Sequence, residues 1–315
     1  MNWYEVKEKS KIGLGYKIMF VLLKITPAVF MRLLAFPVGF FYWLFAPSAR
    51  HISKAFLQTV SSAMEPGLKN KGAKNSTLAH FISFALNLVE NVQSWGGKFS
   101  FKDVIWQEDD VADLVKNINA GKGCLCLVSH LGNAQLMRAL ASENQAGTAR
   151  KMSVTSITDT KITGGFVKLI NSINPDSSLN VISSDEIGPE TIIILQERLE
   201  KGELVVIAGD RISANTDRTL NSTFMNKTAR FPYGVFLLVS LLNVPSYFIG
   251  GLRQKDFSLK PKYQMFVKKI PYDFNCPRKE RAERIQKTCD FYSSALEHFA
   301  KQKPYQWYNF FDFWQ

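Results

Sequence analysis

The chain has 315 residues, 46% of them hydrophobic, which is enough to bury a large core and favours one large domain over two equal ones. Lysine and arginine total 39 against 27 acidic residues, and the resulting net charge of +12 favours anionic partners such as phospholipid headgroups, nucleic acid or acidic carrier proteins. The four cysteines form no C-x-x-C pair, which favours a reducing, cytosol-facing compartment.

The N-terminal part resembles a membrane element. From Ile18 to Phe45 the chain is almost wholly apolar and aromatic, with two charges and two prolines inside the segment and four lysines before it. Its uncharged part, Leu33 to Ala49, is near the lower limit of the roughly 17–25 residues that cross a bilayer. A spanning helix, an interfacial hairpin and a buried amphipathic helix pair all fit this pattern. We therefore expect a membrane anchor or interfacial helices over residues 1–50 and a separate α/β domain over residues 51–315.

Helical and strand patterns alternate in the rest of the chain. Helical periodicity covers residues 48–61 and 76–95, which are joined by a polar connection from Glu65 to Asn75. Apolar runs separated by segments of helical length predict a mostly parallel or mixed central sheet flanked by helices. The runs that predict its strands are Cys124–Ser129, Met152–Ile157, Leu179–Ile182, Leu204–Ala208 and Val244–Ile249.

Residues capable of chemistry follow two of these strands. His130 comes directly after the first run and is followed by Gly132-Asn133. Asp210 and Arg211 follow the run that ends at Ala208, with Gly209 between the run and Asp210. Because the carboxyl ends of parallel strands meet at one edge of a sheet, both groups are expected to face one substrate. A third cluster, Thr228 to Gly234, precedes an apolar helix and offers Arg230 to an anion. Taken singly, each cluster is also compatible with a structural role.

Two other kinds of site are weaker interpretations. Cys126 is a possible nucleophile, and Cys124, Cys126 and His130 are a possible metal site, but a free cysteine is more often a small buried hydrophobic residue. His51, His80 and His298 have no reactive neighbours in the sequence and are expected to be structural.

The ordered set of motifs resembles a known family. His130 with Gly132-Asn133, then Gly209-Asp210-Arg211, then Arg230-Phe231-Pro232-Tyr233-Gly234, and finally Pro304-Tyr305-Gln306-Trp307-Tyr308, is similar to the bacterial lipid A biosynthesis acyltransferases, the late lauroyl and myristoyl transferases. The resemblance runs from the N-terminal segment to the C-terminus. Within that family the chain looks closest to the branch associated with aryl-polyene or similar lipids.

The resemblance implies an enzyme of the bacterial inner membrane whose catalytic domain faces the cytoplasm. Such an enzyme moves a fatty acyl chain from an acyl-carrier-protein or coenzyme A thioester to a hydroxyl of a lipid or glycolipid, without a cofactor, a metal or a nucleic-acid partner. His130 would be the general base, and backbone N–H groups near Gly132 and Asn133, or the Arg211 guanidinium, would stabilise the oxyanion. Asp210 would fix Arg211, and Arg230 would hold a phosphate or the phosphopantetheine arm of the donor.

The sequence departs from the family at one position. Five residues after the histidine the family has an acid, whereas this chain has Gln135, which can bond the imidazole but cannot offset its charge. Another carboxylate could take this role, with Asp210 the first candidate and Glu143 the second. Three interpretations therefore remain: an active transferase with altered support for His130, a catalytically impaired relative that binds lipid or acyl chains, and an unrelated basic membrane-surface protein.

Overall fold

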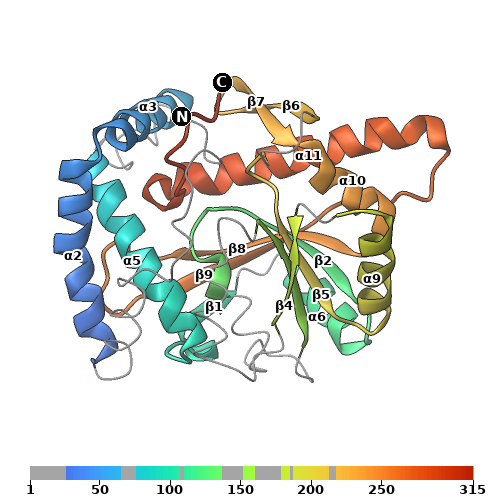
Figure 1. Ribbon diagram of the computed structural model, residues 1–315, viewed down its shortest axis with the longest axis horizontal. Helices are drawn as coiled ribbons and strands as arrows, with labels where there is room; N and C mark the ends of the chain where they lie inside the picture. The colour runs from blue at the N-terminus through green and yellow to red at the C-terminus, as the bar shows by residue number, and fades with distance from the viewer. Residues whose placement is uncertain are drawn as a thin grey trace.

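The computed structural model describes residues 26–64, 76–106, 110–136, 152–159, 179–184, 187–212 and 218–314. Its centre is a seven-stranded sheet with the strand order β1-β9-β8-β2-β5-β3-β4 (Figure 1). The strands of this sheet are β1 Val104–Trp106, β2 Cys124–Val128, β3 Val154–Thr158, β4 Leu179–Ser183, β5 Leu204–Ala208, β8 Ser246–Arg253 and β9 Tyr263–Lys269. All five strands predicted from the sequence are present: β5 has the predicted ends, and the other four differ from the prediction by a few residues at one or both ends.

The direction of the strands makes the sheet mixed but mostly parallel. β8, β2, β5, β3 and β4 run parallel to one another, whereas β9 pairs antiparallel to β8 and carries β1 parallel to itself. The predicted fold class, an α/β protein with a mostly parallel or mixed sheet flanked by helices, is confirmed. Because β2 and β5 are direct neighbours, with Val128 opposite Ala208, the residues that follow these two strands emerge side by side.

Both faces of the sheet are covered, which explains why the central strands are continuous apolar runs. Leu125 and Leu127 of β2 belong to the core on one face, whereas Cys124 and Cys126 belong to the core on the other. The first core is completed by α3 Pro47–Ala63, α9 Pro189–Glu200, α10 Tyr233–Leu242 and α11 Arg278–Gln302, and the second by α6 Val111–Asn119. The cysteines thus share one face of their strand, as their spacing predicts.

A second, two-stranded sheet was not predicted. Its strands are β6 Thr219–Phe224 and β7 Lys227–Pro232, which pair antiparallel. The two residues between the strands, Met225 and Asn226, have φ angles of 54° and 61°, as a two-residue hairpin turn with the twist of the strands requires. Methionine is an unusual residue at positive φ, so the sequence carried only a weak signal for this turn.

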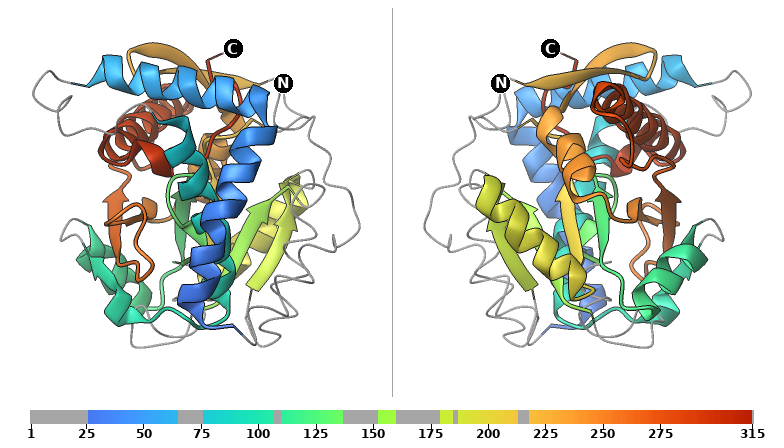
Figure 2. Two further views of the ribbon diagram at one scale, coloured as in Figure 1. Left: turned by 90° about the vertical axis from the view of Figure 1, so that its left-hand side faces the viewer. Right: turned by 90° about the vertical axis from the view of Figure 1, so that its right-hand side faces the viewer.

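Helix α2, Ala28–Phe45, lies along α5, Thr77–Trp95, on the outside of the molecule (Figure 2, left). The helices are antiparallel: Gln93 donates to the carbonyl of Ala28, and the Trp43 indole donates to Thr77, at 3.0 Å and 2.9 Å. Between these contacts the helices approach so closely that a Cβ on Gly39 would lie 2.9 Å from the Ile82 Cα. The predicted helices 48–61 and 76–95 correspond to α3 and α5.

By length and composition α2 is long and apolar enough to cross a membrane. Only 22% of its residues are buried within the protein. Its Arg32 is 5% exposed and donates to the Leu259 carbonyl at 2.9 Å, so this charge faces the domain. Large apolar side chains of the helix are exposed at the surface: Val29, Phe30, Leu33, Leu34, Val38, Phe40, Phe41, Tyr42, Leu44 and Phe45. The expected domain boundary at residue 50 falls inside α3, and residues 1–25 of the expected anchor lie outside the described ranges.

The aromatic C-terminus packs into the domain. After α11 and the short helix η4, Pro304–Gln306, Trp307 lies between Phe56 of α3 and Phe224 of β6, with ring centroids 4.9 Å and 5.0 Å away. Trp307 is 1% exposed. This segment reaches the edge of the sheet where β2 and β5 end. The remaining short element, η2 Phe101–Asp103, precedes β1.

Candidate active site

His130 lies in the turn that follows β2, at the carboxyl edge of the sheet. Its side chain is 34% exposed, so the ring reaches the surface. The Nδ1 atom is 2.8 Å from Oδ1 of Asp210, which follows β5. The structure therefore brings together His130 and Asp210, which are separated by 80 residues in the chain, because β2 and β5 are neighbours.

Asp210 is a buried carboxylate, with 1% of its side chain exposed. It accepts hydrogen bonds from the His130 backbone N–H at 2.8 Å and from the Trp307 indole at 3.1 Å, in addition to the imidazole. Burial alone would raise the pKa of Asp210, but the charge and hydrogen bonds of His130 and the charge of Arg211 together lower it by more. The pKa of Asp210 is therefore below the ordinary value. The residue is ionised at neutral pH.

The bonding of Asp210 fixes the tautomer of His130. A carboxylate only accepts, so Nδ1 carries the proton and Nε2 presents a lone pair. Within the described residues no hydrogen bond occupies Nε2. Burial and the nearby Arg211 lower the pKa of His130, and Asp210 opposes them only in part, so the ring is neutral at pH 7. A neutral imidazole with a free lone pair at the surface can act as a general base.

Gln135 was expected to support the imidazole in place of an acid. In the structure its Oε1 accepts a hydrogen bond from the Trp95 indole at 3.2 Å. The carboxylate partner of His130 is Asp210, which was named as a substitute and also as the residue that fixes Arg211. The carboxylate that supports His130 is thus supplied by residue 210 and not by residue 135.

Gly132 and Asn133 were expected to contact substrate or to stabilise an oxyanion, but in the structure their backbone N–H groups have other partners. The Gly132 N–H donates to the Gln306 carbonyl at 2.7 Å, and the Asn133 N–H donates to the Gly251 carbonyl at 2.9 Å. Asn133 is 0% exposed. Because these donors are already engaged and buried, they hold the turn in place and are not available to a substrate.

Arg211 is the remaining predicted oxyanion donor and lies beside the pair formed by His130 and Asp210, called here the dyad. Its Nη2 donates to the Tyr308 carbonyl at 3.3 Å, and its guanidinium stacks over Phe311 at 5.4 Å from the ring centroid. Burial lowers the pKa of Arg211 to about 10, against the charge of Asp210, so the group remains a cation at neutral pH. Arg230 lies elsewhere, exposed on β7 opposite Asn221.

Two aromatic residues support the dyad and were not singled out for it from the sequence. The Tyr292 hydroxyl of α11 donates to the Val128 carbonyl at 2.8 Å, just before His130, and its ring lies against Gly209, where a Cβ would be 2.9 Å away. Trp307 belongs to the C-terminal motif of the resemblance, which was a signal for its importance. Tyr292 lies in a polar helical segment and carried no signal.

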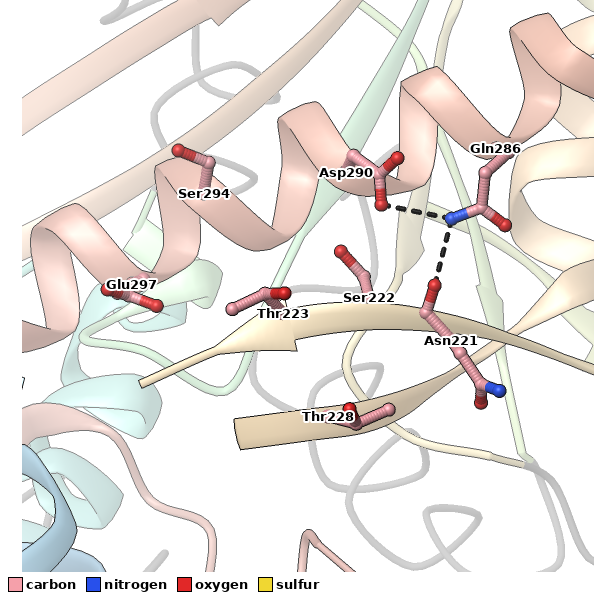
Figure 3. Close-up of a pocket in the computed structure, with 8 residues that line it drawn as sticks. All are labelled: Asn221, Ser222, Thr223, Thr228, Gln286, Asp290, Ser294 and Glu297. Carbon is pink, nitrogen blue, oxygen red and sulfur yellow. Dashed lines mark hydrogen bonds between the residues drawn. The ribbon is translucent and has the colours of Figure 1, made fainter. Parts of the chain in front are cut away.

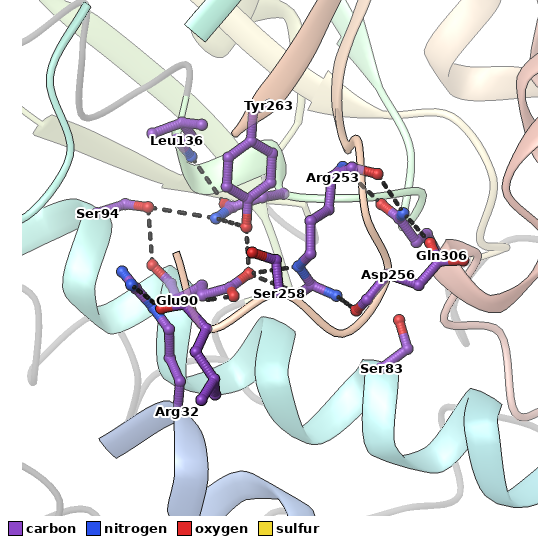
Figure 4. A network of polar contacts seen from close by, with 12 residues as sticks. Arg32, Ser83, Glu90, Ser94, Leu136, Arg253, Asp256, Ser258, Tyr263 and Gln306 are labelled. Carbon is purple, nitrogen blue, oxygen red and sulfur yellow. Dashed lines mark hydrogen bonds and ion pairs between the residues drawn. The ribbon is translucent and has the colours of Figure 1, made fainter. Parts of the chain in front are cut away.

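A buried polar network lies behind the turn that follows His130 (Figure 4). Its centre is Glu90 of α5, which is 0% exposed and accepts from Nε and Nη2 of Arg253 at 3.1 Å and 2.6 Å, and from the Tyr263 hydroxyl. Arg32 of α2 lies 4.0 Å from the same carboxylate. Sequence reasoning missed this network, because its members are scattered over α2, α5, β8 and β9.

The cysteine alternatives are not supported by the geometry. Cys124 and Cys126 are both 0% exposed. Burial raises the pKa of Cys124 to about 12 and that of Cys126 well above the ordinary value, so neither is a thiolate. In the part of the chain that the structure describes, no group of three or more histidine, cysteine, aspartate or glutamate side chains is arranged to hold a metal ion.

Two surface cavities lie away from the dyad. The larger, about 570 Å³, lies between β6, β7 and α11 and is lined by polar side chains, among them Asn221, Gln286 and Asp290 (Figure 3). Gln286 of α11 donates to the Asn221 carbonyl of β6 and to Asp290 on its own helix, both at 2.9 Å. The second, about 310 Å³, lies where α10 meets β8 and β9. Neither cavity is lined by His130 or Asp210.

Comparison with known proteins gave no relative: no family model matches the chain, and no curated protein matches it.

Proposed function

We propose that the protein is a membrane-associated O-acyltransferase that moves a fatty acyl chain from an acyl-carrier-protein or coenzyme A thioester to a hydroxyl of a lipid or glycolipid. The observation that carries the proposal is the pair formed by a partly exposed, neutral His130 and a buried, ionised Asp210 at the carboxyl edge of the sheet. The motif resemblance adds the class of reaction to this geometry.

The proposed reaction is a direct transfer. The acceptor hydroxyl donates to Nε2 of His130, which takes the proton as the oxygen attacks the thioester carbonyl carbon. A carbon–oxygen bond forms, the carbon–sulfur bond breaks, and the imidazolium returns the proton to the departing thiolate. In the proposed reaction Asp210 stabilises the imidazolium, as the acid of a Ser-His-Asp triad does, and the Arg211 cation, next to Asp210 in the chain, stabilises the oxyanion.

The presence of Asp210 weighs on the choice between an active and an impaired enzyme. The impaired alternative rested on Gln135, because an amide cannot offset the charge of the protonated ring. Asp210 supplies that charge, and it bonds Nδ1 directly at 2.8 Å. The active transferase is therefore the function that this geometry supports best.

The association with a membrane is supported by α2. Its inner side is fixed to α5 and carries the buried Arg32, while its outer side exposes large apolar side chains along the whole helix. A helix held in this way fits an interfacial position, with its apolar side in the lipid and its axis along the surface. We propose that the membrane is the bacterial inner membrane and that the catalytic domain faces the cytoplasm, where thioester donors are found. Arg230 remains a candidate for a donor phosphate.

The test is acyl transfer by detergent-purified protein, with radiolabelled acyl-carrier protein or acyl-coenzyme A and a bacterial lipid extract. His130→Ala is expected to reduce transfer to a small residual rate, and Asp210→Asn to lower it by up to about four orders of magnitude, the loss that an acid-to-amide change causes in a serine-protease triad. Asp113→Asn is the matched control, because Asp113 is also a carboxylate with hydrogen-bonded partners, Tyr247 and Lys269, but lies away from the site. Transfer by His130→Ala at the wild-type rate would remove the proposal, and acyl binding without transfer would favour the impaired relative.

A further inference from the structure

The turn Leu131–Asn133, directly after His130, is held from several sides. Leu131 and Gly132 form isolated bridges with Trp307 and Gly251 respectively, and the Tyr308 N–H donates to the His130 carbonyl at 2.9 Å. Gly132 has a φ angle of +67°, and a Cβ there would lie 2.1 Å from the Gly251 carbonyl oxygen. The backbone at His130 is therefore enclosed, and its position depends on the groups around the turn.

Asn133 connects this turn to the buried network. Its Nδ2 donates to the Ser94 hydroxyl at 3.2 Å and to the Tyr263 hydroxyl at 3.4 Å, and its Oδ1 accepts from the Leu136 N–H at 2.9 Å. Both hydroxyls then lead to Glu90: Tyr263 donates to its carboxylate, and Ser94 donates to its carbonyl at 2.8 Å.

A second route leads from Glu90 to the other side of the turn. Arg253 is paired with Glu90 through its side chain, and through its backbone with Gln306, whose amide donates to the Arg253 carbonyl and accepts from its N–H, both at 2.8 Å. The Gln306 carbonyl in turn accepts from Gly132. The two routes grip the turn at two consecutive residues, Gly132 and Asn133.

The gain in stability from this arrangement is too small to account for its presence. A buried ion pair between groups that are 0% and 1% exposed contributes little net stability compared with apolar residues of the same size. The hydrogen bonds from Arg253 and Tyr263 to Oε2 of Glu90 do, however, restrict the geometry of the chain around this buried group. A general base needs such a geometry, because a displacement of about 1 Å can lower a rate by about 100-fold.

We propose that Asn133, held by Tyr263 and Ser94, is a positioning residue for His130, and that the Glu90 network acts on the reaction through it. The inference rests on the proposed function for its catalytic consequence. Its structural part, that the network sets the position of the His130 ring, can be tested without any acyl transfer.

The variants remove single hydroxyl groups. Tyr263→Phe and Ser94→Ala each delete one acceptor of the Asn133 amide, and the double variant deletes both. Tyr247→Phe is the matched control: this tyrosine is also 0% exposed, its hydroxyl also donates to a carboxylate, Asp113 at 2.6 Å, and it lies on β8 of the same sheet. Far-UV circular dichroism verifies that each variant is folded.

The first measurement is the rate at which diethyl pyrocarbonate modifies His130, followed by peptide mass spectrometry. Loss of a hydrogen bond worth about 1 kcal/mol allows a displaced turn to be populated about fivefold more, so we expect the rate to rise by about two- to fivefold in each single variant and further in the double variant. Tyr247→Phe is expected to match the wild type. If the folded single and double variants react at the rate of this control, the proposal is overturned, and Ser94→Ala decides the outcome should Tyr263→Phe not fold.

The second measurement uses acyl transfer. Tyr263→Phe is expected to lower kcat by about tenfold and to leave KM unchanged, since misplacement of the base affects the chemical step more than binding. In a His130→Ala background the same change is expected to have no further effect on the residual rate, because the network acts through His130. An equal loss in both backgrounds would contradict a positioning role. Absence of transfer in the wild type would refute the proposed function, while the modification rates would still decide the structural part.

Discussion

His80 provides a test of the fold that does not depend on function. The ring is 0% exposed and joins three elements: Ser53 of α3 lies 2.9 Å from Nδ1, and the Trp307 carbonyl lies 3.0 Å from Nε2. Because a carbonyl only accepts, Nε2 carries the proton and Nδ1 accepts from the serine. The neutral ring is thus fully bonded. Burial lowers the pKa of His80 to about 4, against the opposing bond to Trp307.

The sign of the pH effect follows from this shift. Above pH 6.5 the histidine is neutral in both states and contributes no pH dependence; below it, the unfolded chain binds a proton that the folded protein refuses. The free energy of unfolding therefore falls from about pH 6.5 down to about pH 4. A shift of this size amounts to about 3 kcal/mol in total, of which about 2 kcal/mol is lost between pH 8 and pH 5.

Urea unfolding in detergent at pH 8 and pH 5 measures this loss. His80→Gln keeps a donor for the Trp307 carbonyl but does not titrate, so its unfolding free energy is expected to fall by about 2 kcal/mol less than that of the wild type over the same interval. His298→Gln is the control for the same replacement at an exposed histidine. Equal slopes for the wild type and His80→Gln would refute the reasoning.

Three further predictions concern single positions. Gln135→Glu is expected to change acyl transfer by less than about threefold, because Asp210 already pairs with the imidazole; a gain of tenfold or more would show that the acid partner is missing. Gly132→Ala is expected to lower the melting temperature by about 10 °C or to prevent folding, since a Cβ would lie 2.1 Å from the Gly251 oxygen, whereas Gly234→Ala, with nothing within 4 Å, is expected to be tolerated; similar melting temperatures would contradict the packing of the turn. Maleimide is expected to label Cys276, which is partly exposed, and to spare the buried Cys124, Cys126 and Cys289 until urea is added; rapid labelling of Cys126 in the folded protein would reopen its nucleophilic interpretation.

The strands and the position of His130 were readable from the sequence because they depend on local patterns. A strand buried on both faces is a short apolar run whatever surrounds it, and β2 and β5 show such runs. The residues that follow these runs, His130 and Asp210, were likewise identified by their places at strand ends. The hairpin of β6 and β7 was missed for two reasons. Its strands are polar on the outer side, and its turn is Met225-Asn226, whereas such turns usually have asparagine, aspartate or glycine first and glycine second.

Which polar side chains pair with His130 and with Arg32 was decided only by the tertiary structure. Whether Gln135 or Asp210 supports the imidazole depends on which strand lies beside β2, and β5 takes that place although β3 and β4 come between them in the chain. In the same way, the sequence shows an apolar N-terminal segment, but only packing against α5 shows that Arg32 faces Glu90. Local composition predicts the strands that are buried on both faces, because such strands carry apolar side chains on both sides. Which polar groups meet depends on distances across the whole chain, and these are set by the order in which the strands assemble.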